Sequence, residues 1–183
     1  MKTPVLLTLL ALFAVSATAD APGDAERGAE LLAPFKSNLK QALVAGMQEG
    51  PATAIDVCRD KAPQIATWLS VDGVILGRSS HKLRNPGNTA PQWLAPILQE
   101  WAEAEIHAND AEVDRPQSAL VELPEGRRGY AEPIYMQPLC LTCHGDPAKD
   151  IPPEVVTVLN AKYPQDQAQG AEVVELHGPL KVV

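Results

Sequence analysis

Apolar side chains recur every three or four positions in two stretches near the start of the chain, and this spacing predicts two helices. The apolar positions of the first stretch, 24–49, are Leu31, Leu32, Phe35, Leu39, Leu43 and Met47. Those of the second, about 51–69, are Ile55, Cys58, Ala62, Ile65, Ala66 and Leu69. Gly50 and Pro51 separate the two helices. Pro63 falls inside the second helix, so we expect a kink or a break there, because proline cannot donate the helical hydrogen bond.

The middle of the chain changes to shorter apolar runs bounded by turn residues. Residues 71–80, with several β-branched side chains, are predicted to form a strand, and 81–88 a basic loop rich in turns. Thr89 and Gln92 are spaced as a capping box, which predicts a helix from about 90 to 108.

Most of the predicted strands lie in the last third of the chain. Residues 118–123 and 129–136 form a predicted hairpin, followed by a helix at 152–162. Two closing strands, 171–176 and 180–183, are predicted around a turn at 177–179. Helices at the start and strands toward the end favour an α+β fold.

Residues 1–19 have the pattern of a signal peptide. Lys2 is followed by an apolar run at 5–15, and Ala17-Thr18-Ala19 has the small-x-small form of a cleavage site. The run is too short to span a bilayer, and no other stretch approaches that length. We therefore expect an exported chain with a single domain at 20–183, located in the periplasm if the cell is Gram-negative, with no integral membrane segment after cleavage.

The chain is acidic, with a formal net charge of −8. A strong negative charge argues against binding nucleic acid or an anionic membrane surface. It does not identify a redox partner.

The most informative motif is Cys140-Leu-Thr-Cys143-His144, the C-x-x-C-H attachment signature of a c-type haem. Two thiols at this spacing can form thioethers with the two vinyl groups of one haem, and the adjacent histidine can bind the iron. A redox disulfide or part of a zinc site are the alternatives. No second Cys/His pair is present to complete a zinc site.

The third cysteine, Cys58, has two interpretations. It is either a small buried apolar residue or a thiolate ligand on the other face of the iron. The remaining candidates for that second axial position are Met47, Met136, His81, His107 and His177.

Basic residues gather between 78 and 84. One interpretation is that Arg78, Lys82 and Arg84 lie in a solvated loop. The other is that one or two of them are counter-ions for haem propionates.

Four stretches together resemble a known family: 54–58, 77–88, 130–138 and 140–145. They are similar to the Tll0287-like haem domain, also called the DUF3365 family. The resemblance implies a PAS-like antiparallel sheet flanked by N-terminal and connecting helices. It also implies that the iron is bound by His144 and Cys58. One departure is His177, where relatives tend to have arginine.

These features predict an exported protein with one covalently attached haem c, which acts in single-electron transfer or in sensing redox state or a diatomic gas. A thiolate ligand predicts a low reduction potential, because it stabilises ferric iron. An alternative is a haem enzyme with peroxidase-like activity at an open distal face. A third possibility is a haem-free binding module in which Cys140 and Cys143 form a disulfide.

Overall fold

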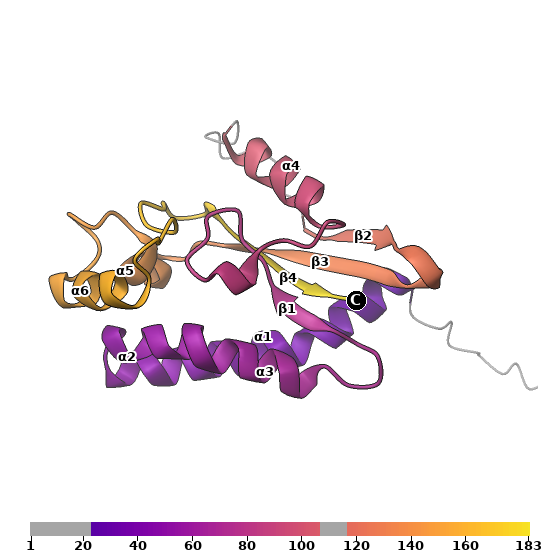
Figure 1. The fold of residues 1–183 in the computed structure, drawn as a ribbon, viewed down its shortest axis with the longest axis horizontal. Coiled ribbons are helices and arrows are strands. Elements are labelled where there is room, and N and C mark those ends of the chain that lie inside the picture. Colours follow the sequence, from indigo (N-terminus) through magenta and orange to yellow (C-terminus); the bar gives the residue numbers. More distant parts are fainter. Residues whose placement is uncertain (1–22, 107–116) are drawn as a thin grey trace, which may run out of the picture.

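The computed structural model describes residues 23–106 and 117–183. They form one four-stranded antiparallel sheet, flanked by helices (Figure 1). The strands, in the spatial order β1-β4-β3-β2, are β1 (Leu76–Arg78), β4 (Leu176–Val182), β3 (Arg128–Tyr135) and β2 (Ala119–Glu122). The α+β fold with an antiparallel sheet is therefore confirmed. The predicted signal peptide at 1–19 and His107 lie outside the described residues.

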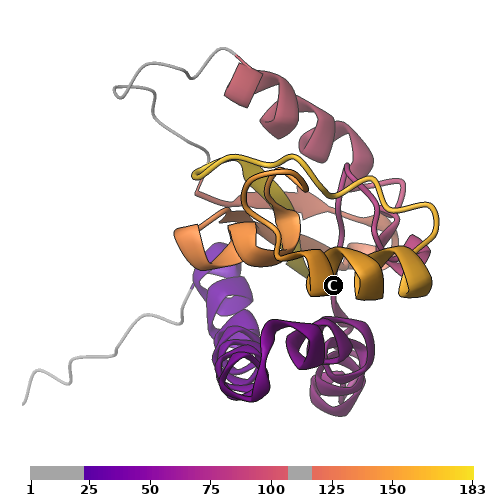
Figure 2. The same ribbon diagram turned by 90° about the vertical axis from the view of Figure 1, so that its left-hand side faces the viewer.

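The helices lie on both faces and at one end of the sheet (Figures 1 and 2). Their bounds are α1 (Asp24–Glu49), α2 (Pro51–Asp56), α3 (Ala62–Leu69), α4 (Ala95–Ile106), α5 (Leu141–His144) and α6 (Pro153–Lys162). Helices α1 and α3 cover one face and α4 the other, while α5 and α6 pack near α2 at one end. Within the described ranges, no helix combines the length and the apolar character needed to cross a membrane.

The main core lies between α1 and the sheet. Leu32 and Phe35 of α1 are fully buried against Leu76, Leu180 and Val182. The predicted apolar stripe of α1 is thus confirmed in its first half. Leu43 and Met47, the last two residues of the stripe, instead line a cavity that is described below.

The opposite face carries a second core, formed by α4. Leu94, Leu98 and Trp101 pack against Ala131 of β3 and Leu176 of β4.

The start of α4 differs from the prediction. The helix begins at Ala95 rather than near 90. Thr89 instead ends the short helical turn Pro86–Asn88, and its hydroxyl donates to the carbonyl of Pro86. The amides of Leu94 and Ala95 both donate to the Pro91 carbonyl, which sets the first turn.

The second predicted helix is divided by a π-helical turn, η1 (Val57–Lys61), which connects α2 to α3. The amide of Ala62 donates to the carbonyl of Val57, five residues earlier, and Pro63 has no amide hydrogen to donate at all. The kink or break predicted from Pro63 is therefore confirmed, and it has the form of a π-helical turn.

The predicted hairpin is confirmed, whereas the predicted closing turn is wrong. Residues 177–179 do not form a turn between two strands, because β4 runs through them without a break. Pro179 lies opposite Pro133 of β3, so two residues without amide hydrogens share one position of the ladder. Gly178 has a φ of 128°, and a Cβ there would lie 2.2 Å from the Ser79 carbonyl oxygen. This close approach of the chain leading out of β1 requires glycine.

Strand β1 is shorter than predicted. Only Leu76–Arg78 of the expected 71–80 strand is in the sheet. Asp72 and Gly73 both have positive φ and turn the chain between α3 and β1. Residues 79–88 then leave the sheet edge as the predicted turn-rich loop, including the short helical turn η2 (Pro86–Asn88).

Candidate functional site

The C-x-x-C-H motif lies in a short helical segment at the end of the molecule where α2 and α6 meet. Cys140 ends the turn η4 (Pro138–Cys140), and Cys143 and His144 belong to the single-turn helix α5. Three positions along a helical turn place the two thiols on one side. None of the three cysteines forms a disulfide.

His144 is held in one orientation by the main chain. Its side chain is 9% exposed, and its Nδ1 lies 2.9 Å from the carbonyl oxygen of Ala168. A carbonyl only accepts, so Nδ1 is the protonated nitrogen and Nε2 carries a lone pair. Burial, and then the charge of Arg84, lower the pKa of His144 to about 3. The imidazole is therefore neutral at physiological pH, the form that binds a metal.

Cys58 lines one cavity together with Cys140, Cys143 and His144. It lies in η1, and π-helical turns of this kind are frequent at functional sites. The walls of this cavity come from α1, α2, η1, the loop after β1, the motif segment and the end of α6. The lining residues are Leu43, Met47, Ala54, Ile55, Cys58, Arg84, Leu139, Cys140, Cys143, His144 and Tyr163. The sequence placed Leu43 and Met47 on an apolar stripe, and they supply the apolar wall of this motif cavity.

Cys58 also lines a second and larger cavity, between α3, β1 and the η2 loop. The larger cavity measures about 490 Å³ and the motif cavity about 70 Å³. Arg78 and Asn85 are among the polar residues of the larger one, and Phe35 and Ala66 among its apolar residues. Cys58 is thus a shared wall of two adjoining spaces.

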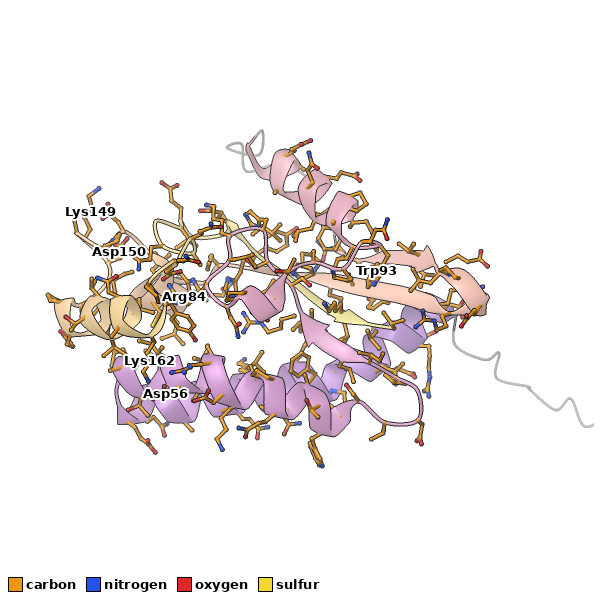
Figure 3. The ribbon with its side chains drawn as sticks, viewed as in Figure 1. Asp56, Arg84, Trp93, Lys149, Asp150 and Lys162 are labelled. Carbon is orange, nitrogen blue, oxygen red and sulfur yellow. The ribbon has the colours of Figure 1, made fainter. Side chains whose placement is uncertain are left out.

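The two arginines of the predicted basic cluster have different surroundings. Arg84 lines the motif cavity, where its Nη2 donates to the Cys143 carbonyl at 2.6 Å and its Nη1 lies 3.5 Å from His144 Nε2. Its Nε donates to the carboxylate of Asp166 at 3.0 Å. Figure 3 shows Arg84 beside α5 and α6.

Arg78 lines the larger cavity instead. Its Nη2 donates to Nε2 of His177 at 2.6 Å, which makes His177 a neutral acceptor. Burial, followed by the charge of Arg78, lowers the pKa of His177 well below its ordinary value. Among the described residues, no carboxylate forms an ion pair with Arg78. Lys82, the third basic residue, pairs with Glu175.

The thiol of Cys143 is kept neutral by its surroundings. Burial is the main cause that raises the pKa of Cys143 to about 11. The charge of Arg84 lowers this pKa by a smaller amount, and Cys58 raises it. Burial, with a smaller effect from Cys58, also raises the pKa of Tyr163. Cys58, Cys143 and Tyr163 all line the motif cavity.

Of the other candidates for a second iron ligand that the structure describes, Met47 alone is a lining residue of the motif cavity. Met136 is buried and is not among the lining residues, nor is His81. The ring of His177 packs edge-on against that of His144, with 4.4 Å between centroids, and its Nε2 is engaged by Arg78.

Sequence reasoning missed the residues that hold the motif from behind. Asp166 and Ala168 lie in a polar segment without apolar periodicity, and a main-chain carbonyl leaves no signature in a sequence.

In the described part of the chain, no group of three or more His, Cys, Asp or Glu side chains is arranged to hold a metal ion.

Comparison with known proteins agrees with the fold. A family model described as Tll0287-like matches residues 20–183. The crystal structure of the cyanobacterial heme-protein Tll0287 is similar, with a TM-score of 0.58 and 21% sequence identity. The match covers 81% of this chain and 89% of that chain. Among curated proteins, none matches.

Proposed function

Because the chain belongs to the Tll0287-like family, we propose that it is a c-type haem protein with one covalently attached haem. One observation carries the proposal: Cys58 and all three residues of the C-x-x-C-H motif line the same cavity. The similar solved structure is that of a heme-protein, and this supports the same ligand here.

The residues present fit such a group. Cys140 and Cys143 would form the thioethers, and His144 offers an unprotonated Nε2 to the iron. Its Nδ1–H bond to a carbonyl is the usual outer contact of a metal-binding histidine. Cys58 lines the same cavity as the motif, so we propose that its sulfur would be the second protein ligand of the iron.

Both cavities are needed to hold a macrocycle. The motif cavity is far below the range of about 300–1,000 Å³ that is typical of ligand sites, whereas the larger one falls within it. The vinyl and propionate groups of haem lie on opposite edges. If the vinyl edge were bonded to Cys140 and Cys143, the larger cavity, which Cys58 and Arg78 line, would be the space available to the propionate edge.

We therefore assign different roles to the two arginines. Arg78, which has no carboxylate partner in the described residues, serves as a counter-ion for a propionate. Arg84 is already balanced by Asp166 and holds the Cys143 carbonyl, so it stabilises the motif itself.

With His144 and Cys58 both holding the iron, the haem would supply single-electron transfer and would have no site for a substrate. A thiolate from Cys58 would stabilise the ferric state and give a low reduction potential. Protonation or release of Cys58 on reduction would expose one position, which is the route to sensing CO or NO. We propose electron transfer or such sensing in an exported protein, with residues 1–19 as the signal peptide, in the periplasm of a Gram-negative cell.

The test is an optical spectrum, ferric and then ferrous, of protein co-expressed with a cytochrome c maturation system. We expect a covalent c-type haem whose ferric spectrum is low-spin with thiolate character. Cys58→Ala should abolish that character, while Met47→Leu, in the same cavity, should leave it unchanged.

Other outcomes would count against specific parts of the proposal. A chain without covalent haem, with Cys140 bonded to Cys143, would overturn it. A spectrum unaffected by Cys58→Ala would remove the thiolate assignment, and peroxide turnover by the ferric protein would then favour the enzyme alternative.

A further inference from the structure

The segment 166–171, which follows α6, wraps around the back of His144 and forms two hydrogen bonds with His144 and one with Gly145. The Ala168 carbonyl accepts from Nδ1 at 2.9 Å. The amide of Ala171 donates to the His144 carbonyl at 2.8 Å, and the amide of Gly170 donates to the Gly145 carbonyl at 2.8 Å. The orientation of the imidazole therefore depends on the shape of this segment.

Asp166 fixes that shape. Its Oδ1 accepts from the amide of Ala168 at 2.9 Å, which closes a turn two residues long immediately before the carbonyl that binds His144. Its Oδ2 accepts from Gln169 Nε2 at 3.1 Å and from Arg84 Nε at 3.0 Å. The side chain is only 3% exposed, so these protein donors replace water.

The same carboxylate connects the segment to the front of the motif. Arg84, bound to Asp166, donates to the Cys143 carbonyl and reaches His144 Nε2. The amide of Gln167 donates to the Leu83 carbonyl, so the two chain segments are also joined directly beside the ion pair. Asp166 is therefore a common attachment for the residues on both sides of the imidazole.

From these contacts we propose that Asp166 is a positioning residue for the axial imidazole, an inference that rests on the proposed haem function. It acts through two effects that can be separated. By accepting from the Ala168 amide, it aims the Ala168 carbonyl at His144 Nδ1. By its charge, it balances Arg84 next to the site. Outer contacts of this kind set the orientation and basicity of a ligating histidine.

Two substitutions separate the effects in the haem-loaded protein. Asp166→Asn keeps an oxygen for the Ala168 amide but removes the charge, whereas Asp166→Ala removes both. Glu132→Ala is the matched control, because Glu132 forms an ion pair between β3 and α1 with no contact to the motif. The readouts are solvent exchange of the His144 Nδ1 proton by NMR, the ferric EPR g-values and the reduction midpoint.

We expect Asp166→Ala to speed exchange of the Nδ1 proton roughly tenfold, the factor given by about 1.4 kcal/mol, and to shift the g-values. Asp166→Asn should keep slow exchange but raise the midpoint, because the unbalanced positive charge of Arg84 favours ferrous iron. Glu132→Ala should change none of the three readouts.

Exchange and g-values like those of the wild type in a haem-loaded Asp166→Ala protein would overturn the positioning role. If Asp166→Ala does not fold, Asp166→Asn decides: an unchanged midpoint overturns the proposal, and a raised midpoint with slow exchange supports it. Failure of the haem proposal is distinguished from these results, because the wild type would then carry no covalent haem.

Discussion

Arg84 and Asp166 form an ion pair whose side chains are only 12% and 3% exposed, with 2.9 Å between Nη2 and Oδ2. The pair joins the loop that leaves β1 to the segment that follows α6. Because a buried charge is costly without its partner, each residue depends on the other. This ion pair therefore makes the region behind the motif sensitive to both substitution and pH.

Acid should weaken the protein through Asp166. Burial alone would raise its pKa, but hydrogen bonds from Arg84 and the Ala168 amide, with the charge of Arg84, hold the pKa below its ordinary value. A lowered folded-state pKa gives stability above the unfolded value of about 3.9 and loses it as pH falls through the folded value. The unfolding free energies of wild type and Asp166→Asn should thus differ at pH 7 and converge below about pH 4.

Urea titrations between pH 3 and pH 7 measure this difference. Asp24→Asn is the control, since Asp24 is largely exposed and its loss should cost at most about 0.5 kcal/mol. A difference between wild type and Asp166→Asn that stays constant over the whole pH range would contradict the linkage.

Arg78→Gln should lower the reduction midpoint of the haem-loaded protein. If Arg78 is the counter-ion of a propionate, as proposed above, removing its positive charge disfavours the extra electron of the ferrous state. The expected shift is on the order of 50 mV, or about 1 kcal/mol for one electron. Arg128→Gln is matched in chemistry, but Arg128 pairs with Asp24 and Glu122 and does not line the larger cavity. Equal shifts in both variants, measured by redox titration, would exclude Arg78 as the counter-ion.

Gly178→Ala should destabilise the protein more than Gly73→Ala. Both residues have positive φ, so both substitutions strain the backbone by about 1–3 kcal/mol. A Cβ at Gly73 meets nothing within 4 Å, whereas one at Gly178 collides with the Ser79 carbonyl. Thermal unfolding should show a lower Tm for Gly178→Ala. Similar Tm values would show that the chain after β1 moves aside at little cost.

The contact between α2 and α6 should depend on apolar packing more than on charge. Asp56 and Lys162 pair between these helices, as Figure 3 shows, but both remain partly exposed. Lys162→Ala should therefore cost less than about 1 kcal/mol. Leu159 is fully buried against Ile55 and Val155, so Leu159→Ala should cost about 2–5 kcal/mol. If urea unfolding shows equal losses of unfolding free energy in the two variants, the ion pair contributes as much as apolar packing to the contact between α2 and α6.

Several elements could be predicted because their information is local. The bounds of α1 follow from one apolar period between an acidic start and Gly50, and the β2–β3 hairpin follows from two apolar runs around Pro124 and Gly126. The division of the second helix follows from Pro63. In each case, residues close in the sequence carry the energetic reason for the structure.

The closing turn at 177–179 was wrong for a physical reason. Gly178 and Pro179 are turn residues when only neighbours in sequence are considered. In the fold, Pro179 faces another proline, and Gly178 is needed where the chain after β1 crosses β4. Both reasons come from partners distant in the sequence.

The C-x-x-C-H motif, the early helices and the α+β class could be recognised from the sequence alone, because spacing and periodicity depend on near neighbours. Three further relationships required the folded chain: Cys58 shares a cavity with the motif, Arg84 forms an ion pair with Asp166, and Ala168 accepts a hydrogen bond from His144. These relationships join segments far apart in the chain. They depend on how helices pack on the sheet and on a main-chain carbonyl, whose position no side-chain pattern records.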